Sequence, residues 1–551
     1  MTQHRVQLCL ASLSLAIFTV PAFAQIAPDA GQLLQQEREA PSLPKASPSI
    51  QIAPALSAAA LPGGATVSIK AVRFVGNSTF TAERLSSVLG DVSAKPYDLA
   101  GLQALAQTIS EYYRTAGYPF ARAFIPEQRF ADGILQIALI EGRYGNISTT
   151  GNSKLAPAAQ RFLADLVPGT VIETAALERT TLILSDQPGI QIAPLIRPGQ
   201  EVGTGDLVVN VSSGPAFSGQ LRADNHGNRY TGEYRAVADL QWDSPFTLGD
   251  QVYLSSNVSD EGQWMGNLSY SLPLNSSGLR GSVGYARIRY ELAKEFANLD
   301  ATGTAGITST GLSYPLVRSH QANLTLAGAY QHKKLVDKQG ATDTRNDKTS
   351  HVGSLTFIFD YRDGLGGGGI NFGNFSYSHG TLNLDTAAKA ADAITAQSQG
   401  SFDKLNLDVA RLQATPVNNL TLYGRLSTQW AGKNLDSSED FGLGGANGVR
   451  AYPSGEGYGD EGWLAQIEAR YQLDSITPFI FYDAGHVKIN ESSWATGDNE
   501  RDLSGYGLGL RYSQKSWSID ASLAWRAGGG EPLSDTKDRN PHAWINAIVR
   551  F

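Results

Sequence analysis

The chain has 551 residues, more than one ordinary domain needs, so about two to four domains are expected. Its formal net charge of −8 argues against a nucleic-acid-binding protein, which normally carries a basic face. No uncharged apolar run approaches the ~18 residues of a membrane-spanning helix. Only 17% of the residues are charged, whereas Gly (58), Tyr (22) and Phe (20) are frequent, and this composition suits a chain of short amphipathic strands.

The first 24 residues have the pattern of a secretory signal peptide. Arg5 supplies a positive start, residues 8–20 are apolar, and residues 22–24 (Ala-Phe-Ala) form a small-x-small cleavage site. The apolar stretch is too short to anchor the chain in a membrane. Cys9, the only cysteine, lies inside this signal, so the exported chain is expected to have no disulfide and no cysteine-ligated metal.

A short helix is predicted over residues 29–40, followed by a tether. Asp29 and Gln32 resemble a capping box, and Pro41 ends the helical pattern. Prolines among Ala and Ser make residues 41–65 an extended linker. The composition equally allows a disordered N-terminus with one transient helical turn.

Residues 66–214 contain an internal repeat. The pattern Val72-x-Phe74-x-Gly76-Asn77 recurs as Ile147-x-Thr149-x-Gly151-Asn152, 75 residues later. Each Gly-Asn pair precedes a helical pattern and then two alternating strands. We therefore predict two β-α-α-β-β units, residues 66–143 and 144–214, each just large enough to hold its own core. One larger α+β domain with a chance similarity is the alternative.

From residue 215 to 551 the pattern predicts strands only. Segments of about ten residues alternate large apolar with small or polar side chains, for example residues 354–361 and 506–512, and 16 such segments can be counted. An outer-membrane β-barrel has ~9–11 residues per strand, an even number of antiparallel strands and a polar lumen. A 16-stranded transmembrane barrel is therefore predicted, and soluble all-β sandwiches are the alternative.

The connections between these segments alternate in length. Residues 275–278 and 474–477 are brief, whereas residues 431–460 and 526–541 are long. Short periplasmic turns and long surface loops are typical of outer-membrane barrels. The last segment is apolar at alternate positions and ends at Phe551, an ending that resembles the recognition signal of outer-membrane proteins. Contact with the barrel assembly machinery and with outer-membrane lipid is expected.

Two motifs make the resemblance to a known family specific. The sixth surface loop, which is long, contains Gly448-Val449-Arg450-Ala451-Tyr452, and the thirteenth strand contains Phe479-x-Phe481-x-Asp483-x-Gly485. With the signal, the tethered helix, the two repeated units and the barrel, they resemble the B-component transporters of two-partner secretion, which include haemolysin-activator and filamentous-haemagglutinin transporters. The motifs are similar to that family's V-R-G-Y and F-x-D-x-G, and its repeated units are POTRA domains. Ala451 replaces the usual Gly, so its backbone must avoid positive φ.

The four residues of the second motif share one face of their strand. A carboxylate that faces hydrocarbon is costly, so Asp483 should face the lumen, where a guanidinium can bind it through two hydrogen bonds. The resemblance implies that the loop folds back into the barrel and that Arg450 meets Asp483. Glu468 and Arg470 share the inward phase of the neighbouring strand and could extend this network. The alternative is that Arg450 is solvated in a flexible loop.

No catalytic motif in the sequence rises above chance. Residues 457–462 formally match G-x-G-x-x-G, but they neither follow a βαβ strand nor open a helix. The eight histidines lack metal-ligand spacing. The sequence therefore predicts no enzyme activity and no metal, cofactor or nucleotide. An outer-membrane hydrolase with a site built from distant strands is the alternative.

The resemblance implies an outer-membrane transporter that recognises an unfolded exoprotein encoded nearby. The exoprotein would be an adhesin, a haemolysin or a contact-dependent toxin. The POTRA units would capture it in the periplasm by adding it to a sheet edge, and Phe124 and Ile125, in a short strand before Pro126, are the candidate edge. The N-terminal helix is expected to plug the barrel at rest. An assembly factor for barrels or lipids, and a passive porin, are the alternatives.

Overall fold

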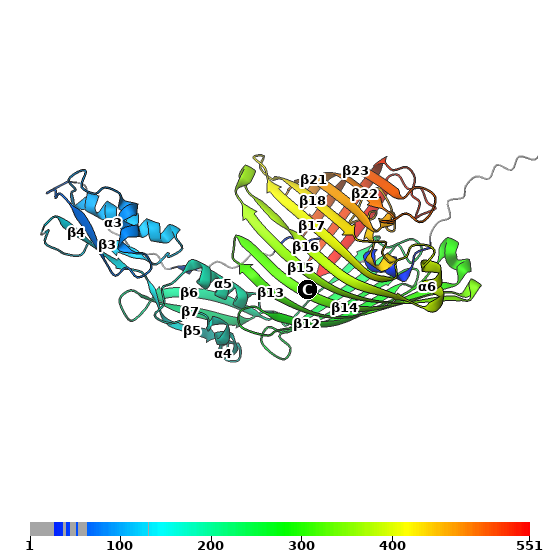
Figure 1. The fold of residues 1–551 in the computed structure, drawn as a ribbon, viewed down its shortest axis with the longest axis horizontal. Coiled ribbons are helices and arrows are strands. Elements are labelled where there is room, and N and C mark those ends of the chain that lie inside the picture. Colours follow the sequence, from blue (N-terminus) through cyan, green and yellow to red (C-terminus); the bar gives the residue numbers. More distant parts are fainter. Residues whose placement is uncertain (1–26, 37–39, 45–50, 53–62, 131) are drawn as a thin grey trace, which may run out of the picture.

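The computed structural model describes residues 27–36, 40–44, 51–52, 63–130 and 132–551. Two small α+β units lie at one end of the molecule and a closed barrel at the other, as Figure 1 shows. The predicted signal peptide lies outside the described residues. In the described part of the chain, no helix has both the length and the hydropathy needed to cross a membrane.

The first α+β unit has the predicted order β-α-α-β-β. Its elements are β2 (Ala71–Val75), α2 (Ala82–Leu89), α3 (Leu99–Thr115), β3 (Arg122–Phe124) and β4 (Ile134–Ile140). Strand β4 lies in the middle of the sheet, parallel to β2 and antiparallel to β3. Alternate β4 residues, Leu135, Ile137 and Leu139, are buried with Ile109 and Tyr113 of α3, so one sheet face and the helices form the core.

The second unit repeats this topology. Its elements are β5 (Arg143–Gly151), α4 (Leu155–Gln160), the 3-10 turn η1 (Arg161–Leu163), α5 (Thr174–Ser185), β6 (Ile190–Pro198) and β7 (Thr204–Ser213). Strand β7 is central, parallel to β5 and antiparallel to β6. A further short strand, β1 (Gln51–Ile52), runs parallel to the outer edge of β6. The two units have separate sheets and separate cores, and do not form a single larger domain.

The repeated Gly-Asn pair has a structural reason. Gly76 and Gly151 follow the first strand of their units with φ of 89° and 101°. A Cβ added at either glycine would lie 2.3 Å from a carbonyl oxygen of the central strand, that of Leu139 or Val211. Only glycine tolerates both this backbone and this close approach, so the repeat marks the turn from the sheet into the helices.

Antiparallel strands close into a barrel of sixteen over the described residues 217–550, which confirms the predicted fold class. They are β8 (Phe217–Asp224), β9 (Arg235–Asp243), β10 (Gln251–Ser259), β11 (Trp264–Pro273), β12 (Arg280–Glu291), β13 (Ala301–Arg318), β14 (Ala322–Gln339), β15 (Thr344–Asp363), β16 (Gly369–Leu384), β17 (Gly400–Ala414), β18 (Leu420–Ala431), β21 (Glu461–Tyr471), β22 (Ile476–Lys488), β23 (Glu500–Ser513), β24 (Trp517–Gly528) and β25 (His542–Arg550). The barrel closes where β25 pairs antiparallel with β8.

The barrel wall separates an apolar outside from a more polar inside. In β22, Ile480 is exposed on the outer face, whereas Phe481 and Asp483 are buried on the inner face. Near the end next to the α+β units, the exposed rings of Phe217 and Trp242 stack with centroids 5.5 Å apart. An apolar outer band with aromatic residues at its rim is typical of barrels that span the outer membrane.

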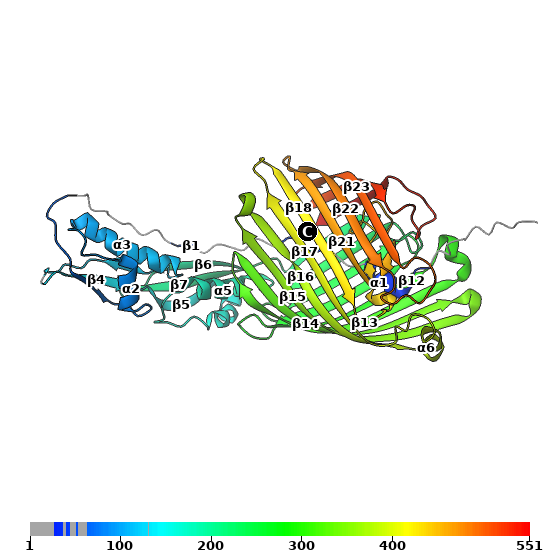
Figure 2. The ribbon, with the colours of Figure 1, turned by 45° about the horizontal axis from the view of Figure 1, so that its top comes forward.

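The connections at the two ends of the barrel differ as predicted. Next to the α+β units they are brief, such as the turn at residues 274–279. At the far end, one long loop contains the helix α6 (Thr386–Asp392), visible at the right in Figure 2. Another, residues 432–460, is called loop six below. It contains the 3-10 turn η5 (Ser437–Glu439) and the short strands β19 (Phe441–Gly442) and β20 (Tyr458–Gly459).

Candidate functional site in the barrel lumen

Loop six folds back into the barrel instead of extending away from it. Its two short strands pair with each other, β19 with β20. The loop and the barrel wall share one buried apolar cluster. The members from the loop are Phe441, Leu443, Val449, Ala451 and Tyr452, and those from the wall are Leu464, Phe479, Phe481, Val487, Leu503 and Ala524. A loop with this many buried apolar contacts is held in one position.

Arg450 of loop six meets Asp483 of β22. Nη2 of Arg450 is 2.7 Å from Oδ1 and Nε is 2.8 Å from Oδ2, so the guanidinium and the carboxylate bind through two parallel hydrogen bonds. The backbone N–H of Arg450 also donates to Oδ2 at 3.1 Å. Both side chains are buried, with Arg450 5% and Asp483 0% exposed. Arg450 is therefore not a solvated arginine in a flexible loop, which was the alternative.

Glu468 of β21 extends the pair into a network. Its Oε1 accepts from Arg450 Nη1 at 2.6 Å, and its Oε2 accepts from Arg470 Nε at 2.7 Å and Arg511 Nη1 at 3.2 Å. Arg511 also donates to Asp520 at 2.6 Å. Three guanidinium groups thus face three carboxylates, and each buried charge has an opposite partner. Removal of one member of such a group leaves a buried charge uncompensated, which costs ~3–5 kcal/mol.

The phenylalanines of the second motif lie against the guanidinium groups. The Arg450 guanidinium carbon is 3.5 Å from the ring centroid of Phe481, and that of Arg511 is 4.1 Å from the ring centroid of Phe479. A cation over a desolvated ring gains about 2 kcal/mol or more. The two rings therefore stabilise the guanidinium groups of Arg450 and Arg511 by cation–π contacts and also shield them from solvent.

Glycines make the room that these side chains and loop six need. Gly507 and Gly509 of β23 lie opposite Phe481 and Phe479 of β22. A Cβ at Gly507 would lie 2.4 Å from a ring carbon of Phe481, and one at Gly509 would lie 2.2 Å from a ring carbon of Phe479. A Cβ at Gly485, the last residue of the motif, would lie 2.3 Å from a methyl carbon of Leu443 in loop six. Each of these positions therefore excludes any larger residue unless the loop or the rings move.

Sequence reasoning missed the side chains that bind the loop backbone at and just before Arg450. Trp544, Gln466 and Arg425 donate to carbonyl oxygens within residues 447–450, at 2.7, 2.9 and 3.0 Å. Gln466 has the same inward phase as Glu468, so the alternation along β21 was a readable signal for it. The carbonyl that each side chain binds depends on the path of loop six, which no strand periodicity reveals.

The N-terminal helix lies in the lumen beside loop six. Helix α1 (Ala30–Gln36) starts where the sequence predicts, and residues 37–39 of the predicted helix lie outside the described residues. Asp29 caps the helix, since its Oδ1 accepts from the N–H of Gln32 at 2.9 Å. Leu33 is fully buried in an apolar cluster with residues of β12, β13 and β14. The helix thus packs against the inner wall of the barrel.

Polar contacts tie the start of α1 to loop six and to the wall. Oδ2 of Asp29 accepts from Ser437 Oγ at 2.6 Å and lies 3.5 Å from Lys348 Nζ. The N–H of Ala30 donates to Asp337 at 3.1 Å. The helix and loop six are therefore held to each other as well as to the barrel.

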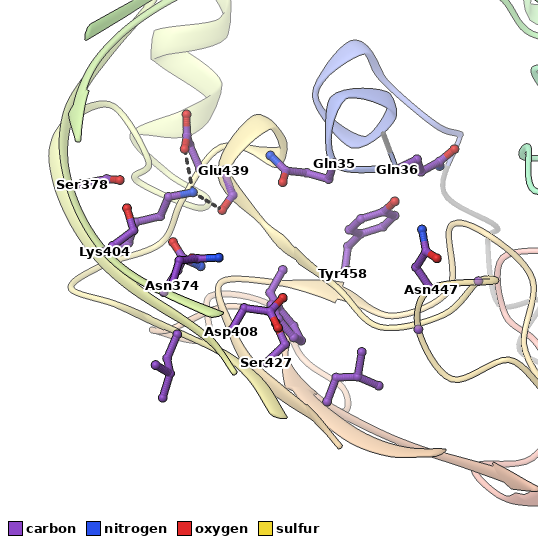
Figure 3. Close-up of a pocket in the computed structure, with 18 of the residues that line it drawn as sticks. Gln35, Gln36, Asn374, Ser378, Lys404, Asp408, Ser427, Glu439, Asn447 and Tyr458 are labelled. Carbon is purple, nitrogen blue, oxygen red and sulfur yellow. Dashed lines mark hydrogen bonds and ion pairs between the residues drawn. The ribbon is translucent and has the colours of Figure 1, made fainter. Parts of the chain in front are cut away.

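A polar cavity of about 440 Å³ remains between α1, loop six and the wall of β15 to β18. Figure 3 shows Gln35 and Gln36 coming from the helix and Lys404 reaching from the wall to Glu439 of loop six. Lys404 and Lys333 lie 2.7 and 2.5 Å from the Glu439 carboxylate, so these charges compensate one another. Most of the other wall positions are polar, with serine, threonine, asparagine, glutamine and charged side chains. This cavity therefore offers hydrogen bonds over most of its surface, with a smaller apolar part that includes Val352 and Leu407.

Among the described residues, no group of three or more His, Cys, Asp or Glu side chains is arranged to hold a metal ion.

The two candidate residues for cargo recognition lie far from the lumen, in the first α+β unit. Phe124 ends β3, which is an edge strand of its sheet, and is 37% exposed. Ile125 follows the strand and packs partly against the core of the unit.

Comparison with known proteins places the chain in a family. Residues 203–512 match the family model for haemolysin secretion/activation protein ShlB/FhaC/HecB, and residues 67–142 match the ShlB-type POTRA domain. The heme/hemopexin transporter protein HuxB of Haemophilus influenzae (strain 86-028NP) is 28% identical over 493 residues, which cover 86% of this chain and 85% of HuxB. The outer membrane transporter CdiB of Dickeya dadantii (strain 3937) is 22% identical over 478 residues, 84% of this chain and 83% of that protein.

The fold is also that of a solved structure. CdiB from Escherichia coli superposes with a TM-score of 0.73 at 18% sequence identity, over 95% of this chain and 96% of that one. The family model alone spans more than half of the chain. With periplasmic α+β units in front of an outer-membrane barrel, this chain belongs to the haemolysin secretion/activation (ShlB/FhaC/HecB) family, the two-partner secretion transporters that export an exoprotein through the outer membrane.

Proposed function

We propose that residues 66–143 and 144–214 act as two POTRA domains that recognise the unfolded exoprotein, and that the barrel, residues 215–551, passes it outward under the control of loop six. The motif residues 448–452 and the second motif on β22 keep the loop in its working position. The observation that carries this proposal is the buried, doubly hydrogen-bonded pair of Arg450 and Asp483. A charge pair of this kind is a strong and directional anchor for a loop.

Transport, and not catalysis, is the role that we propose for the lumen. Its polar wall suits an extended polypeptide, whose backbone groups need hydrogen bonds on the way through. Folding of the exoprotein at the cell surface supplies a driving free energy, because a folded segment cannot return through the channel. The cargo that we propose is an adhesin, a haemolysin or a contact-dependent toxin encoded nearby.

Helix α1 is the proposed plug of the resting channel. Its contacts with Lys348 and Ser437 join it to the barrel wall and to loop six. An isolated helix of seven residues is marginal in water, so α1 owes its stability to these contacts and to the buried Leu33. The plug can therefore be released by the loss of a few contacts.

Cargo recognition is proposed at the edge of β3, with Phe124 and Ile125. An extended peptide can add to a free sheet edge through its backbone, while an exposed aromatic side chain supplies specificity.

At the other end of the chain, we propose that Phe551 is read by the barrel assembly machinery. Its backbone exchanges hydrogen bonds of 3.0 Å with Gly219 of β8, at the closing seam of the barrel, and its ring is exposed.

Export assays with charge variants test the role of the lumenal pair. In cells that produce the transporter and the exoprotein encoded beside it, Arg450→Ala should lower export at least tenfold, because loop six loses its anchor. The barrel should still insert in the membrane and keep its heat-resistant mobility in mild detergent. Asp483→Ala should give the same defect, and the double variant should be little worse than either single one, as expected for contacting residues.

Two further variants make this test specific. Arg450→Lys should rescue export only in part, since an ammonium group cannot reproduce the two parallel hydrogen bonds. Arg345→Ala removes an exposed arginine at the far end of the barrel and should leave export unchanged. A double variant of Arg450 and Asp483 whose defect equals the full product of two independent defects would show that the residues do not act as a pair.

A further inference from the structure

The outer face of strands β12, β13 and β14 carries basic side chains near the end of the barrel that lies away from the POTRA units. The three strands run side by side, as Figure 1 shows. Along β12, Arg287 and Arg289 are exposed, whereas Ile288 between them is buried in the cluster that holds α1. Along β14, Lys334 is exposed and the next residue, Leu335, is buried in the same cluster. Because side chains alternate along a strand, the three cations point outward, to the side of the membrane.

These cations lie just beyond aromatic side chains on the same face. Tyr285 of β12 and Tyr330 of β14 are 50% and 47% exposed. Arg287 is two residues beyond Tyr285 and Lys334 is four residues beyond Tyr330, which corresponds to ~7 and ~14 Å of strand. Aromatic residues flank the apolar band of such a barrel, and a cation on the outer face is costly in the middle of the membrane but not near its surface. Arg287 and Lys334 therefore belong in the headgroup layer at the cell surface.

No carboxylate of the protein neutralises this pair of cations. Within the part of the chain that the structure describes, the side chains of Arg287 and Lys334 make no hydrogen bond and no ion pair. Glu291, farther along the same face of β12, is two residues from Arg289 but four residues from Arg287, ~14 Å along the strand. Glu291 thus opposes the charge of Arg289 first, and the charges of Arg287 and Lys334 remain available for an anion from outside.

A glycine separates the two cations. Gly306 of β13 lies directly opposite Arg287 on one side and Lys334 on the other. Two strand spacings, about 9–10 Å, therefore separate the backbones of Arg287 and Lys334. A Cβ added at Gly306 would meet only the Tyr285 hydroxyl oxygen, at 3.5 Å, so the space above this glycine is open. The two long side chains can close on one anion from both sides, over bare backbone.

We propose that Arg287, Gly306 and Lys334 form a binding site for a phosphate group on the headgroup of a lipid in the outer leaflet of the membrane. A guanidinium group and an ammonium group both donate charge-assisted hydrogen bonds to phosphate oxygens. The ligand is a lipid and not free phosphate, because the site opens sideways on the lipid-facing wall, next to the exposed rings of Tyr285 and Tyr330. The exoprotein passes on the other side of this wall. The site goes beyond the proposed transport function and does not depend on it.

The site lies directly behind the seat of helix α1. Ile288, Ala305 and Leu335 are the sequence neighbours of the three site residues, and on the inner face they share one buried cluster with Leu33 of α1. A phosphate bound by β12 and β14 bridges the outer face of β13. The lipid thus braces, from outside, the part of the wall against which the helix packs.

Binding of a phosphorylated lipid to the full-length transporter tests the site. The probe is lipid A, a glycolipid with two phosphate groups, titrated into the purified protein in an uncharged detergent and measured by native mass spectrometry. Arg287→Ala/Lys334→Ala should weaken binding at least tenfold. Gly306→Val keeps both charges but fills the space between them, and it should weaken binding at least fivefold. Heat-resistant mobility in mild detergent shows that each variant is a folded barrel. Wild-type affinity in either variant would overturn the proposal.

Matched controls change the same kinds of residue elsewhere on the barrel. Lys389→Ala/Lys515→Ala removes two exposed lysines, one in α6 and one in the turn between β23 and β24. Gly424→Val adds the same side chain at another glycine whose Cβ would meet nothing within 4 Å. Both controls should bind lipid A as the wild type does. A loss in these controls equal to that in the site variants would mean that net charge or surface shape, and not this site, governs binding.

Two further probes identify the ligand. Lipid A without its phosphate groups should bind at least tenfold more weakly, and equal binding would overturn recognition of phosphate. Inorganic phosphate at the concentration of lipid A should not displace the lipid, whereas full displacement would assign the site to a soluble anion. Hydrogen exchange locates the contact: lipid A should slow exchange in β12 to β14 of the wild type and leave Gly306→Val unchanged. Slowing of equal size in both proteins would place the lipid elsewhere and refute the site.

Discussion

Ala451 and Gly505 share one small space between loop six and β23. Ala451 stands where the family motif usually has Gly, and it is buried. Its φ is not among the positive values of the chain, as the sequence required. A Cβ added at Gly505 would lie 2.4 Å from the Cβ of Ala451 and 3.0 Å from the carbonyl oxygen of Trp525. The methyl group of Ala451 in loop six is thus accommodated by Gly505 on the barrel wall.

This contact predicts a compensating pair of substitutions. Gly505→Ala should displace loop six and lower export, because overpacking a filled site costs ~1–3 kcal/mol. Ala451→Gly alone should be tolerated, and it should restore most of the export of Gly505→Ala when both changes are combined. Limited proteolysis of loop six in the purified transporter gives a second readout. The control is Gly424→Ala, since an added Cβ there meets nothing within 4 Å. Equal defects with and without Ala451→Gly would mean that another contact is responsible.

For individual residues, the alternation along the strands made the wall residues of the charge network predictable. The inward phase of Asp483, Glu468 and Arg470 follows from a period of two, and the need of a buried carboxylate for a cation led to an arginine. Trp544 could not be predicted as a partner of the loop, because its hydrogen bond is to the carbonyl of Arg450 and depends on how 29 loop residues, 432–460, are folded.

Among the elements, the start of α2 in the first POTRA unit is held by one carboxylate. Glu141, just after β4, accepts from the N–H groups of Ser78 and Thr79 at 2.7 Å and from the Tyr113 hydroxyl at 2.9 Å. Burial raises the pKa of the Tyr113 hydroxyl, which stays protonated as the donor. Burial also acts to raise the pKa of Glu141, but hydrogen bonds from Ser78, Thr79 and Tyr113 outweigh it and leave that pKa below its ordinary value.

The lowered pKa of Glu141 predicts an acid-sensitive turn. A depressed folded-state pKa contributes stability above the unfolded value of 4.5, and this contribution is lost as the pH falls through the folded-state pKa. Hydrogen exchange in the full-length transporter, corrected for intrinsic rates, should show protected Ser78 and Thr79 amides near neutral pH and weaker protection under acid conditions. Glu141→Gln should lower protection at neutral pH and remove the acid-dependent drop. Exposed Glu127→Gln is the control, and a drop of equal size in Glu141→Gln would assign the effect to other groups.

Helix α1 offers a prediction on conductance. Deletion of residues 29–40 should raise single-channel conductance in planar bilayers, because the proposed plug then leaves the lumen. Asp29→Ala should give intermittent openings, since it removes both the helix cap, worth ~0.5–2 kcal/mol, and the contact with Lys348. Asp29→Asn keeps a capping side chain without the charge and should open less often. Unchanged conductance and antibiotic sensitivity after the deletion would exclude the plug.

The elements themselves were largely predictable from the sequence. Period-two alternation, the Gly-Asn repeat and the lengths of the connections gave the sixteen strands and both β-α-α-β-β units. Strand β1 was not predictable: two residues in a Pro-rich linker have no periodicity, and only the free edge of β6 gives them a place. The location of α1 in the lumen likewise depends on contacts with Ser437 and Asp337, which are distant in sequence.

For the whole molecule, the handover of cargo that we propose requires the second POTRA unit to be joined to the barrel. Arg318, at the end of β13, donates to both carboxylate oxygens of Asp186, just after α5, at 2.7 and 2.8 Å. Arg179 of α5 donates to the carbonyl of Pro315 at 2.7 Å. These contacts join the unit to the barrel end that receives the cargo, and most are partly exposed to solvent.

This geometry predicts that the docking contacts set orientation more than stability. An ion pair with one half-exposed partner contributes only ~0–1 kcal/mol, so Asp186→Ala should leave the barrel and the POTRA fold intact. It should, however, widen the range of POTRA positions, because the paired guanidinium fork is the most directional of these contacts. Spin labels on introduced cysteines in β7 and on a barrel turn should show a broader distance distribution, with a several-fold fall in export. Asp165→Ala, an exposed carboxylate on the same unit, should change neither quantity. If Asp186→Ala broadened the distribution without lowering export, the orientation of the second unit would not limit the handover, and the edge strands alone would have to guide the cargo to the lumen.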